Sequence, residues 1–431
     1  MAPVDLHHVA LPAFTLSPER QRTLLAERDA LIETTLELRS AFAAGGHQLD
    51  TSAWKLVKTV DDVRAYRSRR ALHGAPDQTL DDTCDMDSSS SRSSSPSSSV
   101  DRNQLPSLGS SSSSGCGGSG SGSGRSSRPG RRPRRFCPSV KPAARPPAVV
   151  ISGVIDGTAE DAVLGLIAHT DVQFKTRAAH LKTELDNARP LAELVLPTQE
   201  DPLVYAAVKW GLEPYGRFSQ ARDFVFLEAG GLTTDAEGHV VAYAIRQSVD
   251  LSDVIDLPRL PHTIRGYMSG CQTFGNMTPR GDTAHRTVEV FSRAFIEMDG
   301  SVPANMAAAA YAEKLMALAL IIECAYTHKL AYLMRRSTTR SQCGAQWYRH
   351  SSNTCTNCTR AVCRVLFRPL QSGGSCRICQ RTFCGKCSIT RKMYVTLGNE
   401  VLQKEMLFCL ECLLEAKSLD AHVVASDKIN W

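Results

Sequence analysis

The chain of 431 residues lacks an apolar run of the length that a membrane span requires. The longest such run, Leu315–Ile322, is far shorter than the ~18 residues that cross a bilayer as a helix. The first residues, MAPVDLHHVALPAF, also lack the basic n-region and the apolar stretch of a secretory signal peptide. We therefore expect an intracellular, soluble protein whose fifteen cysteines lie in a reducing compartment.

The sequence also lacks a recognisable catalytic constellation. No Ser/His/Asp arrangement and no pair of carboxylates stands at a spacing typical of an active site. We expect Cys271 and Cys324 to be small buried hydrophobic residues, not nucleophiles. The formal charge of +6 is mild, and 42% hydrophobic residues suffice for a sizeable core in two or three domains. These features favour a function other than catalysis.

Eight of the cysteines form four C-x2-C pairs separated by gaps of 17, 4 and 21 residues. A tetrahedral zinc ion needs two such pairs, and the gap of 4 residues is too short for the middle pairs to share one ion comfortably. The spacing suits a cross-brace, in which pairs one and three hold one zinc and pairs two and four hold another. A disulfide framework is the alternative, but the chain shows no secretory context. In chain order the pairs are Cys355/Cys358, Cys376/Cys379, Cys384/Cys387 and Cys409/Cys412.

The rest of the chain predicts a mixed α+β domain interrupted by a polar segment. A capped amphipathic helix is expected over residues 17–43, followed by strands at Trp54 and at Val63–Tyr66. Residues 85–147 consist mainly of Ser, Gly, Pro and Arg and are expected to be disordered. The basic run RSSRPGRRPRRF within them is either a tether to nuclear import, nucleic acid or an anionic membrane, or a plain spacer.

After residue 147 the pattern predicts strands joined by short turns, hence an antiparallel sheet. VVISGVIDG reads as a strand, and a helix follows from Thr158 towards Ile167. A long helix over Val302–Met334 ends this part. The further strands are expected at Val204–Trp210, Arg222–Leu227, His239–Val249, Thr263–Gln272 and Arg286–Met298.

Several short motifs follow one another in the order of the START lipid-transfer family. They are Trp54 with DVRAY, then KW, ARDFVF, QSV, IRGY and MDGSVP. The chain thus resembles a START-like helix-grip domain, a curved antiparallel sheet closed by a long C-terminal helix, built from residues 1–84 and 148–336 around the 85–147 insertion. The resemblance implies a cavity for one lipid. Arg222, Asp223 and Arg265 are candidates for its head group, although Arg222 and Asp223 also suit a structural ion pair.

Residues 345–416 resemble a FYVE zinc finger, with a tail over 417–431. The block Cys376–Ser388 reproduces the family's C-x2-C-x4-C-x2-C-S core. The family's metal scheme agrees with the cross-brace. Its three phosphoinositide-gripping motifs depart here: Trp347-Tyr-Arg-His, Ser372-Gly-Gly-Ser-Cys and Leu407-Phe-Cys lack the expected charged groups. Trp347, Leu370 and Arg377 are the candidates for membrane contact, and the remaining basic residues either attract anionic lipid or balance the thiolate charge.

The sequence therefore predicts a non-enzymatic protein that holds a lipid in a START-like cavity and docks on a membrane or a protein partner through a two-zinc module. We expect a cytoplasmic location, with peripheral attachment to an endosomal membrane, while the basic run leaves the nucleus open. Nucleic acid is not the expected partner. Two alternatives stay open: a PHD-like chromatin or protein reader, and a START-fold enzyme that acts on a bound apolar substrate.

Overall fold

The computed structural model describes most of the chain outside the Ser/Gly/Arg-rich segment. The predictions for residues 70–145, Trp347 and Leu370 concern residues outside the described part of the chain. The described residues are 6, 9–11, 14–69, 146–181, 188–213, 220–258, 260, 262–277, 286–300, 302–317, 320–342, 353–362, 373–397 and 400–429.

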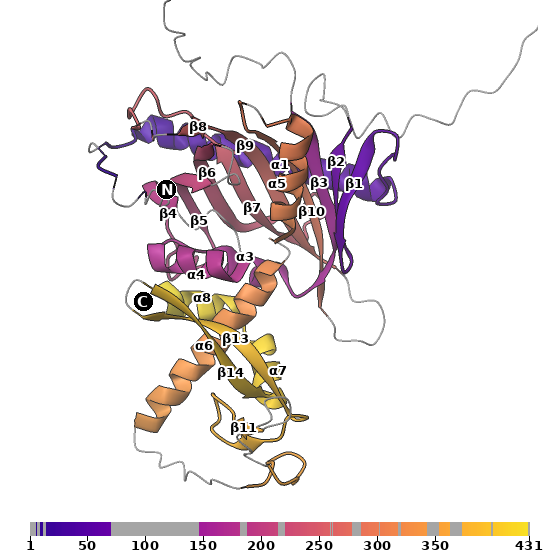
Figure 1. The fold of residues 1–431 in the computed structure, drawn as a ribbon, viewed down its shortest axis with the longest axis vertical. Coiled ribbons are helices and arrows are strands. Elements are labelled where there is room, and N and C mark those ends of the chain that lie inside the picture. The colour runs from indigo at the N-terminus through magenta and orange to yellow at the C-terminus, as the bar shows by residue number, and fades with distance from the viewer. Residues whose placement is uncertain are drawn as a thin grey trace, which may run out of the picture. The chain divides into compact units, whose positions relative to one another are not determined.

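The main body is a ten-stranded sheet, antiparallel except for the short β8, which runs parallel to β6 (Figure 1). Its order is β1-β2-β3-β10-β9-β7-β6-β5-β4. The strands predicted between residues 204 and 249 and over 286–298 are confirmed, whereas the single strand predicted over Thr263–Gln272 is wrong, because β8 and β9 occupy this range; β4 was not predicted. The bounds are β1 Trp54–Val60, β2 Val63–Ser68, β3 Ala148–Asp156, β4 Ala188–Val195, β5 Tyr205–Glu213, β6 Ala221–Thr234, β7 Val240–Ser248, β8 Thr263–Arg265, β9 Tyr267–Asn276 and β10 Thr287–Glu297.

Strands β2 and β3 pair directly although about 80 residues separate their sequences. Arg67 lies opposite Val149, and the Ala148 amide donates a hydrogen bond to the Ser68 hydroxyl (3.0 Å). Both flanks of the Ser/Gly/Arg-rich segment therefore belong to one sheet.

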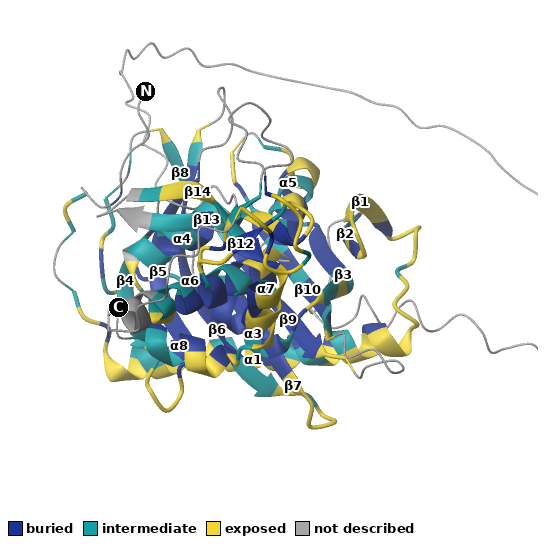
Figure 2. Ribbon diagram, turned by 90° about the horizontal axis from the view of Figure 1, so that it is seen from below, coloured by how far each residue is buried: buried dark blue, intermediate teal, exposed yellow. Residues whose placement is uncertain are grey.

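The outer face of the sheet is covered by α1, Pro18–Ala44, as the sequence predicted. Ser17 caps this helix by accepting a hydrogen bond from the Arg20 amide (3.1 Å), and Pro18 occupies the first turn. Ile32 packs with outward side chains of β6, β7 and β9, and Phe42 packs with Phe291 of β10. Burial is concentrated in the central strands (Figure 2).

The inner face carries α3 (Ala159–Leu166), α4 (Asp171–Leu181) and α5 (Ala304–Ala317). The predicted single helix over Val302–Met334 is wrong: α5 ends at Ala317, and α6 begins at Ile321 and continues to Gln342. The sheet packs against α5, whereas α6 crosses α3 and runs towards the C-terminal part (Figure 1). The crossing is close, because a Cβ added at Gly165 would lie 2.0 Å from the Ile321 carbonyl oxygen. An unbroken helix could not make both contacts.

The C-terminal part contains two small sheets and two helices. The pair β11–β12 lies among the cysteines, and β13–β14 is a long hairpin whose strands reach α4. The tail expected over 417–431 contains α8, which packs against α3 and α6. No described helix is both long enough and apolar enough to cross a membrane. The bounds are β11 Gly374–Ser375, β12 Thr382–Phe383, β13 Ser388–Leu397, β14 Glu400–Cys409, α7 Leu410–Ser418 and α8 Ala421–Ile429.

Candidate functional site

The eight predicted cysteines form two clusters of four, and the crossed grouping predicted from their spacing is confirmed. In each cluster the four sulfur atoms lie within 4.8 Å of one another. The first cluster contains Cys355, Cys358, Cys384 and Cys387, and the second contains Cys376, Cys379, Cys409 and Cys412.

The cluster geometry fits tetrahedral zinc. A Zn–S bond of about 2.3 Å places the sulfurs of a four-cysteine site about 3.8 Å apart. Here the sulfurs of Cys358 and Cys384 are 3.5 Å apart, and those of Cys379 and Cys409 are 3.9 Å apart. Each of these distances joins two different C-x2-C pairs, as a cross-brace requires.

The chain around the clusters supplies hydrogen bonds to the sulfurs. The Asn357 side-chain amide donates to the Cys387 sulfur (3.4 Å), and the Cys412 amide donates to the Cys409 sulfur (3.4 Å). Cys409 is also the N-cap of α7, so this helix begins at the second cluster. A hydrogen bond to the Cys379 sulfur raises the pKa of Arg381, which places one guanidinium against that cluster. Arg377, the described candidate for membrane contact, is exposed in the turn between Cys376 and Cys379.

Inside the main body, one buried carboxylate binds three basic side chains. Glu228 on β6 is 1% exposed. Its oxygens accept hydrogen bonds from Arg177 Nη2 of α4 (2.7 and 3.0 Å), Lys209 Nζ of β5 (2.8 Å) and Arg246 Nε of β7 (3.2 Å). Arg177 also donates to the Leu166 carbonyl at the end of α3. The group therefore ties α3 and α4 to the inner face of the sheet.

Burial and the neighbouring charges shift the pKa values of Glu228 and Lys209 in opposite directions. Burial alone raises the pKa of Glu228, but Arg177, Lys209 and Arg246 together hold it well below its usual value. Burial lowers the pKa of Lys209 to about 8, although Glu228 opposes the shift. At pH 7 Glu228 is therefore a carboxylate and Lys209 an ammonium, and arginine side chains are always charged in proteins.

A small central hollow lies beside Glu228, between the sheet, α3 and α5. Its volume is about 20 Å³, which is room for about one water molecule. The Gln272 amide and the Tyr311 hydroxyl have no hydrogen-bond partner among the described residues, although both side chains are buried. The central hollow is lined in part by Leu166, Glu228, Arg246, Gln272, Tyr311 and Leu315.

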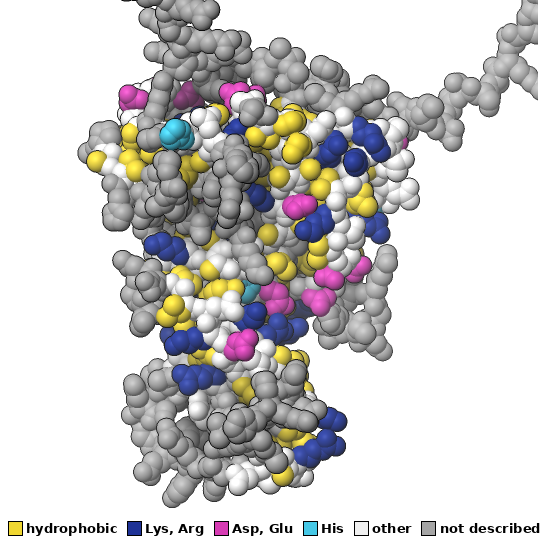
Figure 3. Space-filling model, viewed as in Figure 1, with side chains coloured by type: hydrophobic (Ala, Val, Ile, Leu, Met, Phe, Trp, Pro, Cys, Tyr) yellow, Lys and Arg dark blue, Asp and Glu magenta, His cyan; other side chains and the backbone are white. Residues whose placement is uncertain are grey.

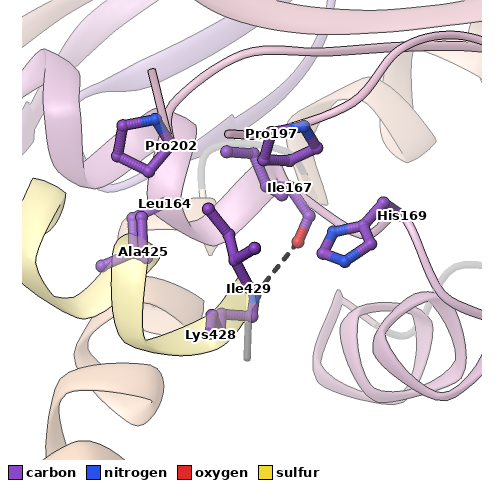
Figure 4. Close-up of a pocket in the computed structure, with 8 residues that line it drawn as sticks. All are labelled: Leu164, Ile167, His169, Pro197, Pro202, Ala425, Lys428 and Ile429. Atoms are coloured by element: carbon purple, nitrogen blue, oxygen red, sulfur yellow. Dashed lines mark hydrogen bonds between the residues drawn. The ribbon is translucent and has the colours of Figure 1, made fainter. Parts of the chain in front are cut away.

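A second hollow, of about 10 Å³, lies between α3 and α8 (Figure 4). Lys428 of α8 is 3% exposed and donates to the Ile167 carbonyl at the C-terminal end of α3 (3.1 Å). Its Nζ also lies 3.3 Å from His328 Nε2. The α3 helix is thus held on one side by the sheet and on the other by α8.

The three predicted head-group residues lie away from the central hollow. Arg222 donates to the Met298 and Asp299 carbonyls (2.9 Å each) and thereby holds the turn before α5. Asp223 points to the opposite face of β6 and accepts from Trp210 Nε1 (2.8 Å) and Arg265 Nη2 (2.7 Å). These contacts give each residue a structural role, and the predicted contact with lipid stays untested.

Sequence reasoning passed over the residues that do line the central hollow or surround Glu228. The charged residues among them could have been found from the sequence, because each is a single charge at an inward-facing position of an otherwise apolar strand. Lys209 follows AAV, Glu228 follows FVFL and Arg246 follows AYAI. Each faces the same side of its strand as apolar residues of the inner core, such as Phe224 and Phe226 beside Glu228.

Comparison with solved structures finds remote similarity to lipid-transfer proteins. Human StAR-related lipid transfer protein 5 has a TM-score of 0.37 and 11% identity, covering 71% of this chain and 97% of that one. Human STARD10 has a TM-score of 0.30 and 9% identity, covering 77% and 84%. A STAR-related lipid transfer protein fragment from Xanthomonas axonopodis has a TM-score of 0.32 and 12% identity, covering 63% of this chain and 99% of that one. No protein-family model and no curated protein sequence matches the chain.

Proposed function

We propose that the chain is a non-enzymatic lipid-binding protein. The sheet and α5 enclose one lipid, and the cysteine-rich part, loaded with two zinc ions, docks on an anionic membrane or a protein partner. The supporting observation is that the buried side chains of Gln272 and Tyr311 in the central hollow have no hydrogen-bond partner among the residues that the structure describes. Buried polar groups nearly always have hydrogen-bond partners, so the polar end of a ligand is the expected partner here.

Lipid binding requires the central hollow to widen. The hollow measures about 20 Å³, whereas pockets that hold a ligand typically measure roughly 300–1,000 Å³. The described helix ends at Ala317, and α6 is fixed separately to α3, by the Gly165 crossing and by an ion pair between Lys329 and Asp161 (2.5 Å). In this proposal the hollow widens by a displacement of α5 from the sheet, while α6 keeps its contacts with α3.

The test of lipid binding pairs two glutamine variants of neighbouring strands. Gln272→Leu removes an unpartnered amide from the central hollow, whereas Gln247→Leu removes a hydrogen bond to the Tyr267 hydroxyl (2.8 Å) outside it. Lipids are extracted from the purified full chain and identified by mass spectrometry, and rebinding is measured with a fluorescent lipid.

We expect one intact lipid per wild-type chain. Gln272→Leu should bind it more weakly yet unfold at a higher denaturant concentration, because a buried unsatisfied amide costs about 1–3 kcal/mol. Gln247→Leu should show the reverse: weaker stability and unchanged binding. Absence of both extracted lipid and rebinding in the wild type contradicts the proposal, and recovery of a chemically altered lipid supports the enzyme alternative.

A non-enzymatic role agrees with the one Cys–His contact among the described residues. The Cys324 sulfur lies 3.6 Å from His328 Nε2, as in a nucleophile–base pair, but both side chains are buried. Burial raises the pKa of the Cys324 thiol to about 11 and lowers that of His328. The thiol is therefore protonated at neutral pH and inaccessible to a substrate.

The zinc ions have a structural role in this proposal. Four thiolates close each site and leave no open position, so the metal supplies folding free energy to the cysteine-rich part. Elemental analysis of reduced protein should give two zinc ions per chain. Cys384→Ser should lose zinc and unfold residues 353–429, whereas Cys116→Ser, outside both clusters, should retain two ions. One zinc ion or none in the wild type rules out the cross-brace.

Docking on a membrane is supported by basic side chains on the cysteine-rich part. Arg377, Arg381, Lys386, Lys392 and Lys404 are exposed there, and Lys and Arg side chains are visible over this lower region in Figure 3. Exposed charges act through a screened field, so binding to anionic vesicles should be weak and salt-sensitive.

Vesicle flotation with matched surface charge tests this docking. We expect no preference for phosphatidylinositol 3-phosphate, because the three gripping motifs are altered. Tight binding to that lipid alone at physiological salt contradicts the expectation, and selective binding to a modified histone tail supports the PHD-like reader.

A further inference from the structure

The charges around Glu228 do not balance. Arg177, Lys209 and Arg246 all form ion pairs with Glu228, and these three side chains have no other carboxylate partner within the described part of the chain. Three positive charges and one negative charge leave an excess of +2. Arg177 and Lys209 are 2% and 4% exposed, so water screens this excess poorly.

The excess charge reaches the central hollow through Arg246. This residue and Glu228 both line the hollow, and Arg246 is 15% exposed. Its Nε and Nη2 atoms bind Glu228, which leaves the Nη1 group without a described partner. Beside it the Gln272 amide and the Tyr311 hydroxyl have no partner among the described residues. Guanidinium, amide and phenol groups can all donate, so three donors converge on one small space.

From this charge excess and these donors we infer that the polar end of the bound lipid is an anion, a carboxylate or a phosphate, held by Arg246, Gln272 and Tyr311. The inference rests on the proposed lipid binding and names the chemical class of the ligand. A neutral hydroxyl would satisfy one or two donors but would leave the excess of +2 in the interior. A cationic head group would increase that excess.

The Tyr311 hydroxyl stays a donor at neutral pH, since burial raises its pKa to about 12. The side chains around the head-group position thus present donors next to a net positive charge, a combination that favours charge-assisted hydrogen bonds.

The test compares amphiphiles that share one alkyl chain and differ in charge: hexadecanoic acid, hexadecyl phosphate and hexadecanol. Each displaces a fluorescent lipid from the full chain at pH 7.4 and physiological salt, below its aggregation concentration. We expect an anionic member to bind at least about tenfold more tightly than hexadecanol, because hydrogen bonds to charged groups are stronger than neutral ones. The ratio of acid to phosphate identifies which anion the site prefers.

Arg246→Gln should reduce this preference to about threefold or less, because it weakens the anionic probes more than hexadecanol. Arg64→Gln, on the exposed side of β2, is the matched control and should retain the full preference. Because Arg246→Gln also removes an ion pair of Glu228, Tyr311→Phe provides a second variant that leaves the ion pairs intact and should weaken the anionic probes more than hexadecanol.

The outcomes separate this inference from the proposed function. Equal binding of hexadecanol and both anions would falsify the inference and leave lipid binding standing. A preference for anions that survives both Arg246→Gln and Tyr311→Phe also overturns it, since the anion then lies elsewhere. No binding of any of the three probes contradicts the proposed function itself.

Discussion

The substitution Glu228→Gln tests the buried charge group most directly. Glutamine has nearly the same size and shape as glutamate, so the change leaves packing intact and removes only the negative charge. Arg177, Lys209 and Arg246 would then lie together in the interior without a counter-ion. Removing one partner of a buried ion pair typically costs about 3–5 kcal/mol. We expect a loss in this range, a large fraction of the stability of an ordinary domain.

The assay is equilibrium unfolding of the full chain in denaturant at pH 7, followed by tryptophan fluorescence, since Trp210 is fully buried in the sheet. Glu289→Gln is the matched control. Glu289 also lies on a strand and binds an arginine, Arg39 Nε at 2.9 Å, but its side chain is 15% exposed and borders solvent. We expect a loss of about 1 kcal/mol or less there.

The pH dependence gives a second measurement of the same group. The three basic side chains hold the pKa of Glu228 below its usual value, so its contribution to stability is present above the usual carboxyl pKa and is lost as the pH falls through the folded value. The difference between wild type and Glu228→Gln should be constant from pH 7 to about pH 5 and should shrink at lower pH. Equal losses for Glu228→Gln and Glu289→Gln at pH 7 would refute the reasoning.

Three further predictions concern α8, the crossing of α3 and α6, and the segment between β2 and β3. Lys428→Met should raise the free energy of unfolding at pH 7 by about 2 kcal/mol, because burial lowers the pKa of Lys428 to about 8. This gain should shrink between pH 8 and pH 10, because the Lys428 ammonium of the folded wild type loses its proton in that range. Gly165→Ala should lower the melting temperature by several degrees, since its Cβ meets the Ile321 carbonyl, whereas Gly45→Ala, with ordinary contacts of 3.5 Å, should not. Deletion of residues 88–140 should leave the melting temperature and lipid binding unchanged, because β2 and β3 pair directly; loss of folding would show that the segment is required.

Local patterns in the sequence were sufficient for the elements that local rules determine. Ser17 followed by Pro18 marks the start of α1, and alternating apolar residues mark the central strands. The crossed cysteine grouping also followed from spacing alone, because pairs only four residues apart cannot close on one ion without crowding the turn between them. In each case the information lies within a few residues of the feature it determines.

The break between α5 and α6 depends on contacts far away in the sequence. Residues 315–322 are continuously apolar and contain neither glycine nor proline, so nothing local interrupts the helix. The break allows α5 to cover the sheet while Ile321 meets Gly165 of α3. For the same reason the helix α8 was not predicted within the tail: its contacts are distant, and Lys428 finds its partners 100 and 261 residues away in the sequence.

The charged group around Glu228 was predictable in part: more so than the break between α5 and α6, and less so than the elements that local patterns determine. Its members come from four separate segments, so their contacts could not be read from any one of them. Strand parity was nevertheless sufficient to nominate them, because Glu228 is two residues beyond Phe226 and four beyond Phe224 and so must face the same side of β6. A lone charge on the apolar side of a buried strand is costly unless it is paired. Three such residues on neighbouring strands, Lys209, Glu228 and Arg246, therefore imply one another as partners, and their unequal signs already indicate the positive excess from which we infer an anionic ligand.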